Sequence, residues 1–175
     1  PSLLVQKIQG GFLMQTKRLV LSGLLVSFGV LASHVIVVPV GVAKAYPLQH
    51  TINVIGAVML GPGYAVANAL LISLLRNILG VGSVLAFPGS IFGAMLAGLF
   101  YKHFKNEFSA GIGEVIGTGI VGSLVAFPLS RFLLGSETGA FFFIPPFLIS
   151  SLVGAVLGIF TVKSLSGLGN GVLLK

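Results

Sequence analysis

The sequence predicts an all-α integral membrane protein with six transmembrane helices. Of its 175 residues, 55% are hydrophobic and only 7% are charged, and the mean hydropathy is +1.10. Soluble domains typically carry about 25% charged residues, so a soluble core of this length would not bury so much apolar surface. Helices of about 17–25 apolar residues cross a bilayer, and apolar runs of this kind recur along the chain. Lipid is therefore the expected solvent.

Glycine and proline mark the boundaries of the expected spans. The six spans cover residues 19–38, 48–60, 64–79, 84–101, 112–134 and 142–162. The first follows Lys17 and Arg18, and the second follows Pro47, whose missing N–H is not needed in the first turn of a helix. A Gly-Pro-Gly sequence at residues 61–63 separates the second span from the third, and Phe-Pro-Gly at residues 87–89 is expected to interrupt the fourth.

Basic residues predict the orientation, because cytoplasmic loops of membrane proteins carry an excess of lysine and arginine. With the N-terminus in the cytoplasm, seven basic residues fall on the inner side and three on the outer side. The inner set is Lys7, Lys17, Arg18, Lys102, Lys105, Lys163 and Lys175, and the outer set is Lys44, Arg76 and Arg131. This distribution favours a protein with both termini in the cytoplasm.

The domain organisation follows from the short loops, which leave no room for a soluble domain. Residues 14–175 are expected to form a single six-helix membrane domain. Met14 followed by Gln-Thr-Lys-Arg is typical of a natural start, so residues 1–13 are expected to be an added or disordered N-terminal extension.

Several classes of chemistry are excluded by what the chain lacks. There is no cysteine, which excludes disulfides, thiolate catalysis and cysteine metal sites. The patterns G-x-x-x-x-G-K-[ST], G-x-S-x-G and H-E-x-x-H are absent, so ATP hydrolysis by a phosphate loop and hydrolase chemistry are not indicated. His34, His50 and His103 are far apart, and acidic residues are few. We therefore expect no metal, no cofactor and no enzymatic activity, and we favour binding or transport.

One polar stretch, residues 40–53 (VGVAKAYPLQHTIN), lies between two apolar runs. Gln49, His50 and Asn53 are three or four residues apart, so they share one face of a helix. Polar side chains facing lipid are costly, so this face is expected to point into the bundle. Its amide and imidazole groups suit a small polar heterocycle. The alternative interpretation is a solvated turn between two spans.

Further candidate site residues lie on the same outer side. Tyr46 is placed to stack on a bound ring, and Lys44 to close over it from the loop. Arg76 and Asn77 end the third span, and Phe142 begins the sixth. Aromatic walls with a few convergent polar groups are typical of a small-molecule pocket, although lipid contact or packing would also explain the phenylalanine.

Glu114 has two interpretations. An ionisable group inside a membrane is a functional candidate, as in proton-coupled transport. At the cytoplasmic start of the fifth helix, the carboxylate would instead be stabilised by the helix dipole and pair with Lys102 or Lys105. The expected span boundaries favour this second interpretation.

Small residues mark two helix faces, because they let helices approach closely. Gly113, Gly117 and Gly122 lie near one another on the fifth helix, where they predict internal packing. Gly23 and Ser27 form a small-xxx-small pair on the first helix, which suits either internal packing or a partner protein.

The chain resembles the substrate-binding S components of energy-coupling factor (ECF) vitamin transporters, and among them the ThiW-type subgroup, assigned to uptake of the thiazole precursor of thiamine. The resemblance covers about residues 14–164. It rests on residues 38–62 (VPVGVAKAYPLQHTINVIGAVMLGP), 74–94 (LLRNILGVGSVLAFPGSIFGA) and 113–122 (GEVIGTGIVG).

This resemblance implies a six-helix ECF S-component fold in the cell membrane of a prokaryote. It also implies a vitamin site near the outer face, with the loop between the first two helices as a lid. The partners it implies are a transmembrane coupling subunit and two cytoplasmic ATPase subunits. The family's A-x-x-x-A contact motif falls at Gly23 and Ser27, which replace the alanines with other small residues.

The expected substrate is hydroxyethylthiazole, a neutral thiamine precursor. Thiamine itself is a cation, and the chain has no tryptophan and only Glu137 as an acid expected on the outer side. The hydroxymethylpyrimidine precursor and thiamine remain alternatives. A stand-alone proton-coupled carrier that uses Glu114 is a different functional hypothesis.

Overall fold

The computed structural model describes residues 3–40, 43–135, 137, 139 and 141–167. Its elements, in chain order, are α1 (Leu3–Val35), β1 (Val38–Val40), β2 (Ala43–Ala45), α2 (Pro47–Met59), α3 (Pro62–Ile78), α4 (Ala86–Phe104), α5 (Glu107–Val115), the π-helical segment η1 (Ile116–Gly122), α6 (Ser123–Leu134) and α7 (Ile144–Gly167). The segments α5, η1 and α6 form one continuous helix from Glu107 to Leu134.

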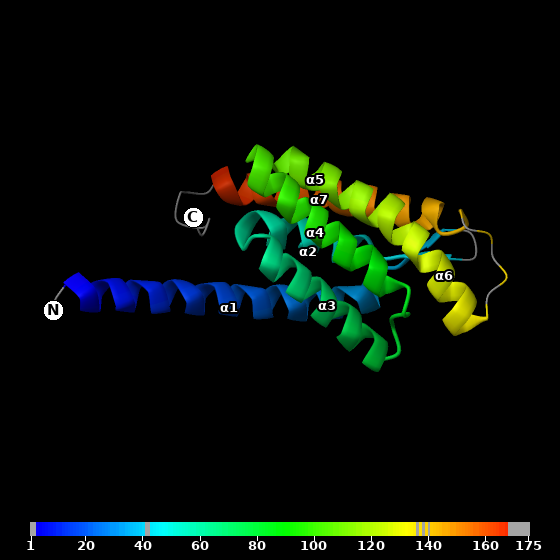
Figure 1. Cartoon of the computed structure of the whole chain (residues 1–175), viewed down its shortest axis with the longest axis horizontal. Coiled ribbons are helices and arrows are strands. Elements are labelled where there is room, and N and C mark those ends of the chain that lie inside the picture. The colour runs from blue at the N-terminus through cyan, green and yellow to red at the C-terminus, as the bar shows by residue number, and fades with distance from the viewer. Residues whose placement is uncertain (1–2, 41–42, 136, 138, 140, 168–175) are drawn as a thin grey trace.

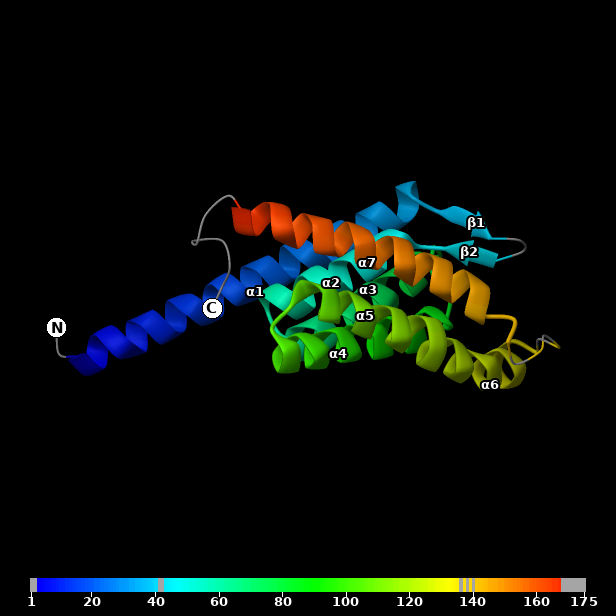
Figure 2. The same ribbon diagram turned by 90° about the horizontal axis from the view of Figure 1, so that it is seen from above.

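The helices pack as a bundle around α2. This short helix contacts α1, α3, α4, α5 and α7. Figures 1 and 2 show successive helices running in alternating directions, so that the N-terminal end of α1 lies at the same end of the bundle as the C-terminal end of α7. The first turns of α1 extend beyond the other helices (Figure 2).

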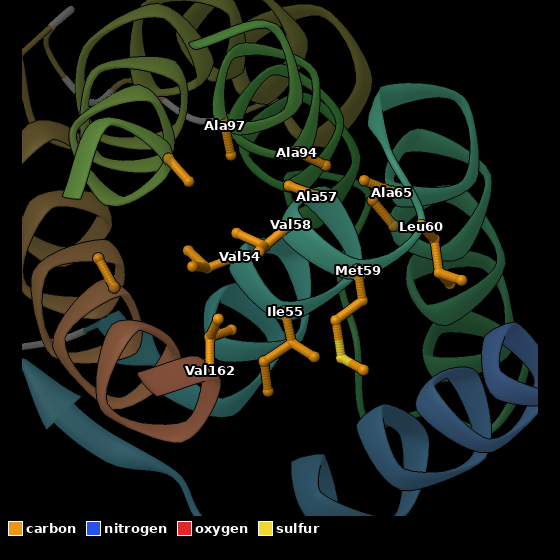
Figure 3. Close-up of a cluster of buried hydrophobic side chains, with 13 residues drawn as sticks. Val54, Ile55, Ala57, Val58, Met59, Leu60, Ala65, Ala94, Ala97 and Val162 are labelled. Atoms are coloured by element: carbon orange, nitrogen blue, oxygen red, sulfur yellow. The ribbon is translucent and has the colours of Figure 1, made fainter. Parts of the chain in front are cut away.

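The apolar core surrounds α2. Every residue of α2 except Leu48 is buried. Figure 3 shows Ala94 and Ala97 of α4 and Val162 of α7 pointing toward this helix, and each of these three side chains has no exposed surface. Because lipid tails are as apolar as these side chains, close packing rather than exclusion of water holds such helices together. Because α2 lies at the centre of this packing, its polar residues are enclosed by protein.

Glycines allow the continuous helix of residues 107–134 to lie directly on α4. A Cβ atom at Gly113 would lie 2.5 Å from the carbonyl oxygen of Leu96, and one at Gly117 would overlap the backbone of Phe92. A Cβ at Gly122 would lie 2.6 Å from the Cα of Gly89. The prediction of internal packing by these glycines is confirmed.

Three described helical segments are long and apolar enough to cross a membrane, namely residues 10–35, 107–134 and 144–167. The helices α2, α3 and α4 have 13, 17 and 19 residues. Many large apolar side chains are exposed on the outside of the bundle, including Leu24, Phe132 and Phe160. An apolar exterior around an enclosed polar interior is the arrangement that lipid requires.

Several features of the helices differ from the expectation. The first helix begins at Leu3, so residues 3–13, expected to lie outside the domain, continue α1. The expected interruption of the helix at residues 87–89 is wrong. Pro88 lies in the first turn of α4, where a backbone N–H has no partner within the helix, so the missing N–H of proline does not break it. The fifth helix begins at Glu107 instead of residue 112, because the Asn106 side chain caps it by accepting from the N–H of Phe108.

The fourth difference lies in the loop between α1 and α2. Residues 38–40 and 43–45 form an antiparallel hairpin in which Pro39 is paired with Lys44. The first helix therefore ends at Val35 rather than residue 38. The backbone N–H of Tyr46 donates to Ser150 Oγ of α7 at 2.9 Å, which ties the end of the hairpin to the bundle.

Candidate functional site

A cavity of about 630 Å³ opens at the hairpin end of the bundle. Its walls come from the ends of α1 and α3, the starts of α2, α4 and α7, and the hairpin. Six of the predicted site residues line it: Lys44, Tyr46, Gln49, His50, Arg76 and Phe142. The volume falls in the range of about 300–1,000 Å³ that is usual for small-molecule sites.

Arg76 forms one polar wall. It lies in the last turn of α3, where a cation is favoured by the helix dipole, and its side chain is buried. The guanidinium carbon lies 3.9 Å from the centroid of the Tyr46 ring, a cation–π contact. Nη1 donates to Oε1 of Gln49, and Nη2 donates to the carbonyl oxygen of Val81 at 3.4 Å. Arg76 thus holds Tyr46 and Gln49 in place.

Gln49 connects α2 to α3. Its Nε2 donates to Ser73 Oγ at 2.9 Å, while its Oε1 accepts from Arg76. Both ends of the amide are therefore engaged, which fixes its orientation. The prediction that Gln49 points into the bundle agrees with its burial.

His50 joins a second polar cluster, which lies behind the cavity wall. Its Nδ1 is 2.7 Å from Oε1 of Glu114. The same carboxylate oxygen accepts from Asn53 Nδ2 at 3.1 Å and lies 2.9 Å from Thr118 Oγ1. Glu114 has no exposed surface. The cluster comes from α2, α5 and the π-helical segment η1, and π-helical turns are frequent at functional sites.

The favoured interpretation of Glu114 is therefore wrong. The carboxylate pairs with His50 rather than with Lys102 or Lys105. The physical reason is the early start of α5 at Glu107, seven residues before Glu114. At a rise of about 1.5 Å per residue, this places Glu114 about 10 Å inside the bundle.

Asn53 and Asn77 lie outside the cavity wall. Asn53 is buried one turn further along α2 than Gln49 and donates to the backbone oxygen of Ser90 at 3.1 Å as well as to Glu114. Asn77 donates to the carbonyl oxygens of Ser73 and Ser83 at 2.8 and 3.0 Å. It therefore supports the turn after α3. Neither residue belongs to the cavity lining, and their direct contact with a ligand stays a prediction.

Aromatic side chains form another part of the cavity lining. Phe142 packs edge-to-face on Phe143, with ring centroids 5.3 Å apart, and Phe143 packs in the same way on Phe147 at 6.3 Å. All three phenylalanines line the cavity. Of these three, only Phe142 is a site residue predicted from the sequence, and His34, which was not predicted to belong to the site, also lines the cavity.

Other predicted residues lie away from the cavity lining. Glu137 is exposed and does not line the cavity. Gly23 and Ser27 are exposed on α1, where a Cβ at Gly23 would meet no atom within 4 Å. Ser27 Oγ donates to the carbonyl oxygen of Gly23 at 2.9 Å, so its hydroxyl needs no partner from outside. This face of α1 is not used for packing inside the bundle.

The apolar helical exterior, and the cavity lined by aromatic and polar side chains at one end of the bundle, together define a membrane protein with a candidate small-molecule site. A family model described as thiamine-precursor transporter protein (ThiW) matches residues 19–167. The chain therefore belongs to the ThiW family, a family of transporters rather than enzymes. Searches of the curated proteins and of the solved structures found no match.

Proposed function

We propose that this protein is the substrate-binding S component of an ECF importer and that it captures hydroxyethylthiazole in the cavity at the hairpin end. The observation that carries the proposal is the composition of that cavity in a member of a thiamine-precursor transporter family. The guanidinium of Arg76 lies over the aromatic ring of Tyr46, and Gln49 and His50 add polar atoms to the same lining. This combination suits a flat, polar heterocycle.

The charge of the lining favours a neutral ligand. Among the described residues, the lining includes the cations Lys44 and Arg76 and no aspartate or glutamate. Like charges repel strongly where water is scarce, so the thiazolium of thiamine is disfavoured. The hydroxymethylpyrimidine precursor is the nearest competitor, since Gln49 and His50 also match ring nitrogens and an amino group.

We place both termini in the cytoplasm and the cavity at the outer face, with six transmembrane helices. The supporting observation is the separation of basic residues along α2. Arg18, Lys102 and Lys105 line a second cavity of about 560 Å³ at the C-terminal end of α2, whereas Lys44 and Arg76 lie at its N-terminal end. The larger basic set marks the cytoplasmic side. The membrane in this proposal is the plasma membrane of a prokaryote.

Uptake in this proposal depends on partner subunits. The chain has no phosphate-loop motif, so the energy would come from two cytoplasmic ATPase subunits acting through a transmembrane coupling subunit. The exposed pair Gly23 and Ser27 on α1 is the proposed contact for that coupling subunit, because small residues let two membrane helices approach closely.

Calorimetry on the purified protein tests the binding proposal. The protein in detergent, without ATP or partners, is titrated with hydroxyethylthiazole, hydroxymethylpyrimidine and thiamine. The proposal expects the tightest binding for the thiazole alcohol. Absence of a signal with all three compounds would rule out the proposed function, and a preference for the pyrimidine would replace the substrate.

A stand-alone proton-coupled carrier is the second candidate, and the burial of Glu114 against His50 favours it. Ionisable groups enclosed in a membrane often relay protons. This candidate predicts accumulation of substrate in proteoliposomes under a pH gradient, without partner proteins, and loss of accumulation in Glu114→Gln. The S-component proposal predicts no accumulation by the protein alone.

A further inference from the structure

Glu114 does not line the cavity, yet it contacts the ring of a residue that does. His50 is part of the cavity lining, and its Nδ1 lies 2.7 Å from Glu114 Oε1. The Glu114 carboxylate is fully buried, and Glu114 lies 64 positions from His50 in the sequence. Its influence on a bound molecule therefore has to pass through the imidazole.

The hydrogen-bond chemistry identifies the donor and the acceptor in this contact. An amide nitrogen only donates, so Glu114 Oε1 accepts at its 3.1 Å contact with Asn53 Nδ2. An ionised carboxylate has no hydrogen to donate, so in the carboxylate form Glu114 Oε1 also accepts from His50, whose Nδ1 then carries the hydrogen. The second ring nitrogen, Nε2, has no hydrogen-bond partner among the described residues and is the one left to meet a ligand.

The surrounding backbone holds this arrangement tightly. A Cβ at Gly93 would lie 2.5 Å from Glu114 Oε1, so only glycine on α4 leaves room for the carboxylate. A Cβ at Gly154 on α7 would lie 2.5 Å from the Cβ of His50. Thr118 Oγ1, which donates to the carbonyl oxygen of Gly89 at 2.9 Å, closes the remaining side. The pair is thus enclosed by α2, α4, η1 and α7.

From this geometry we propose that Glu114 is a positioning residue for ligand recognition. It holds His50 with Nδ1–H turned inward and Nε2 turned to the cavity, so that the site selects a small heterocycle bearing a hydroxyl group over the same heterocycle without one. This inference rests on the proposed function and adds the chemical group that is recognised. A hydroxyl meets Nε2 as donor or acceptor, whereas an alkyl group leaves that nitrogen without a partner.

Two ligands and one variant test the inference. Calorimetry compares 5-(2-hydroxyethyl)-4-methylthiazole with 5-ethyl-4-methylthiazole, which has no hydroxyl. The wild-type protein is expected to prefer the alcohol by about tenfold, as one hydrogen bond would give. Glu114→Leu, which has no acceptor for Nδ1–H, is expected to lose most of this preference by weakening alcohol binding alone. Ser123→Ala removes a buried hydroxyl from the same continuous helix, outside the cluster, and should leave the preference unchanged.

The outcomes separate this inference from the proposed function. No binding of either ligand to the wild type overturns both. Binding with the same alcohol preference in wild type and Glu114→Leu overturns the positioning role alone. If the variant weakens the binding of both ligands equally, Glu114 has only a structural role, and this outcome also overturns the positioning role.

A measurement on the wild type covers the case in which Glu114→Leu does not fold. Nitrogen-15 NMR of histidine-labelled protein, with the His50 signal assigned by its loss in His50→Ala, reports which ring nitrogen carries the hydrogen. A protonated Nδ1 is the expected result. An unprotonated Nδ1 with a protonated Nε2 would overturn the proposal.

Discussion

The buried carboxylate of Glu114 on α5 lies 2.7 Å from Nδ1 of His50, and it links the continuous helix of residues 107–134 to the cavity at the start of α2. Its other oxygen, Oε2, has no hydrogen-bond partner among the described residues. A buried acidic group is costly unless it is paired. The contact with His50, a residue of the cavity lining, therefore also offsets part of the cost of burying Glu114.

The first prediction concerns Tyr46, an aromatic residue of the cavity lining. Tyr46→Ala should weaken thiazole binding by about tenfold or more, because the ring under the ligand and its contact with Arg76 are both lost. Tyr46→Phe keeps the ring and should bind within about threefold of the wild type. Calorimetry with both variants checks this, and equal affinity of the alanine and phenylalanine variants would contradict it.

The second prediction concerns the packing of α7 on α2. Gly154→Ala places a methyl group against the Cβ of His50 and the carbonyl oxygen of Pro47. Overpacking of this kind typically costs about 1–3 kcal/mol, so the unfolding temperature in detergent should fall. Gly23→Ala is the matched control, since its new methyl group meets open space. A fall of the same size in both variants would contradict the packing role of Gly154.

The third prediction separates binding from uptake. Gly23→Leu combined with Ser27→Leu puts bulky side chains on the exposed face of α1 and touches nothing in the cavity. Thiazole binding by the purified variant should match the wild type, while co-purification with a coupling subunit and uptake by cells should be lost. Normal uptake by the variant would remove this face from the proposed partner contact.

The fourth prediction concerns ligand charge. Since Lys44 and Arg76 line the cavity and no acid does among the described residues, the neutral thiazole alcohol should bind about 100-fold more tightly than thiamine. Arg76→Gln should reduce this difference by weakening thiazole binding more than thiamine binding. Competition titrations measure both values, and tighter binding of thiamine to the wild type would contradict the prediction.

Local spacing was sufficient to predict one part of the site. The i, i+3 and i, i+4 relation of Gln49, His50 and Asn53 correctly placed all three inside the bundle. Such predictions succeed because helical periodicity is a property of neighbouring residues.

The position of Glu114 could not be predicted in this way. It depends on the capped start of α5 after Asn106 and on the approach of α2, which lies more than 60 positions away in the chain. The roles of Asn53 and Asn77 as supports behind the wall also depend on contacts between helices. The glycines that allow this close packing were visible in the sequence, but their partners were not.

The most direct test of the account is a structure of the protein bound to hydroxyethylthiazole. The account predicts the thiazole ring between Tyr46 and Phe142, with its hydroxyl group within hydrogen-bond distance of His50 Nε2. Ligand bound elsewhere, such as the cavity beside Arg18 and Lys102 at the opposite end of α2, would contradict it.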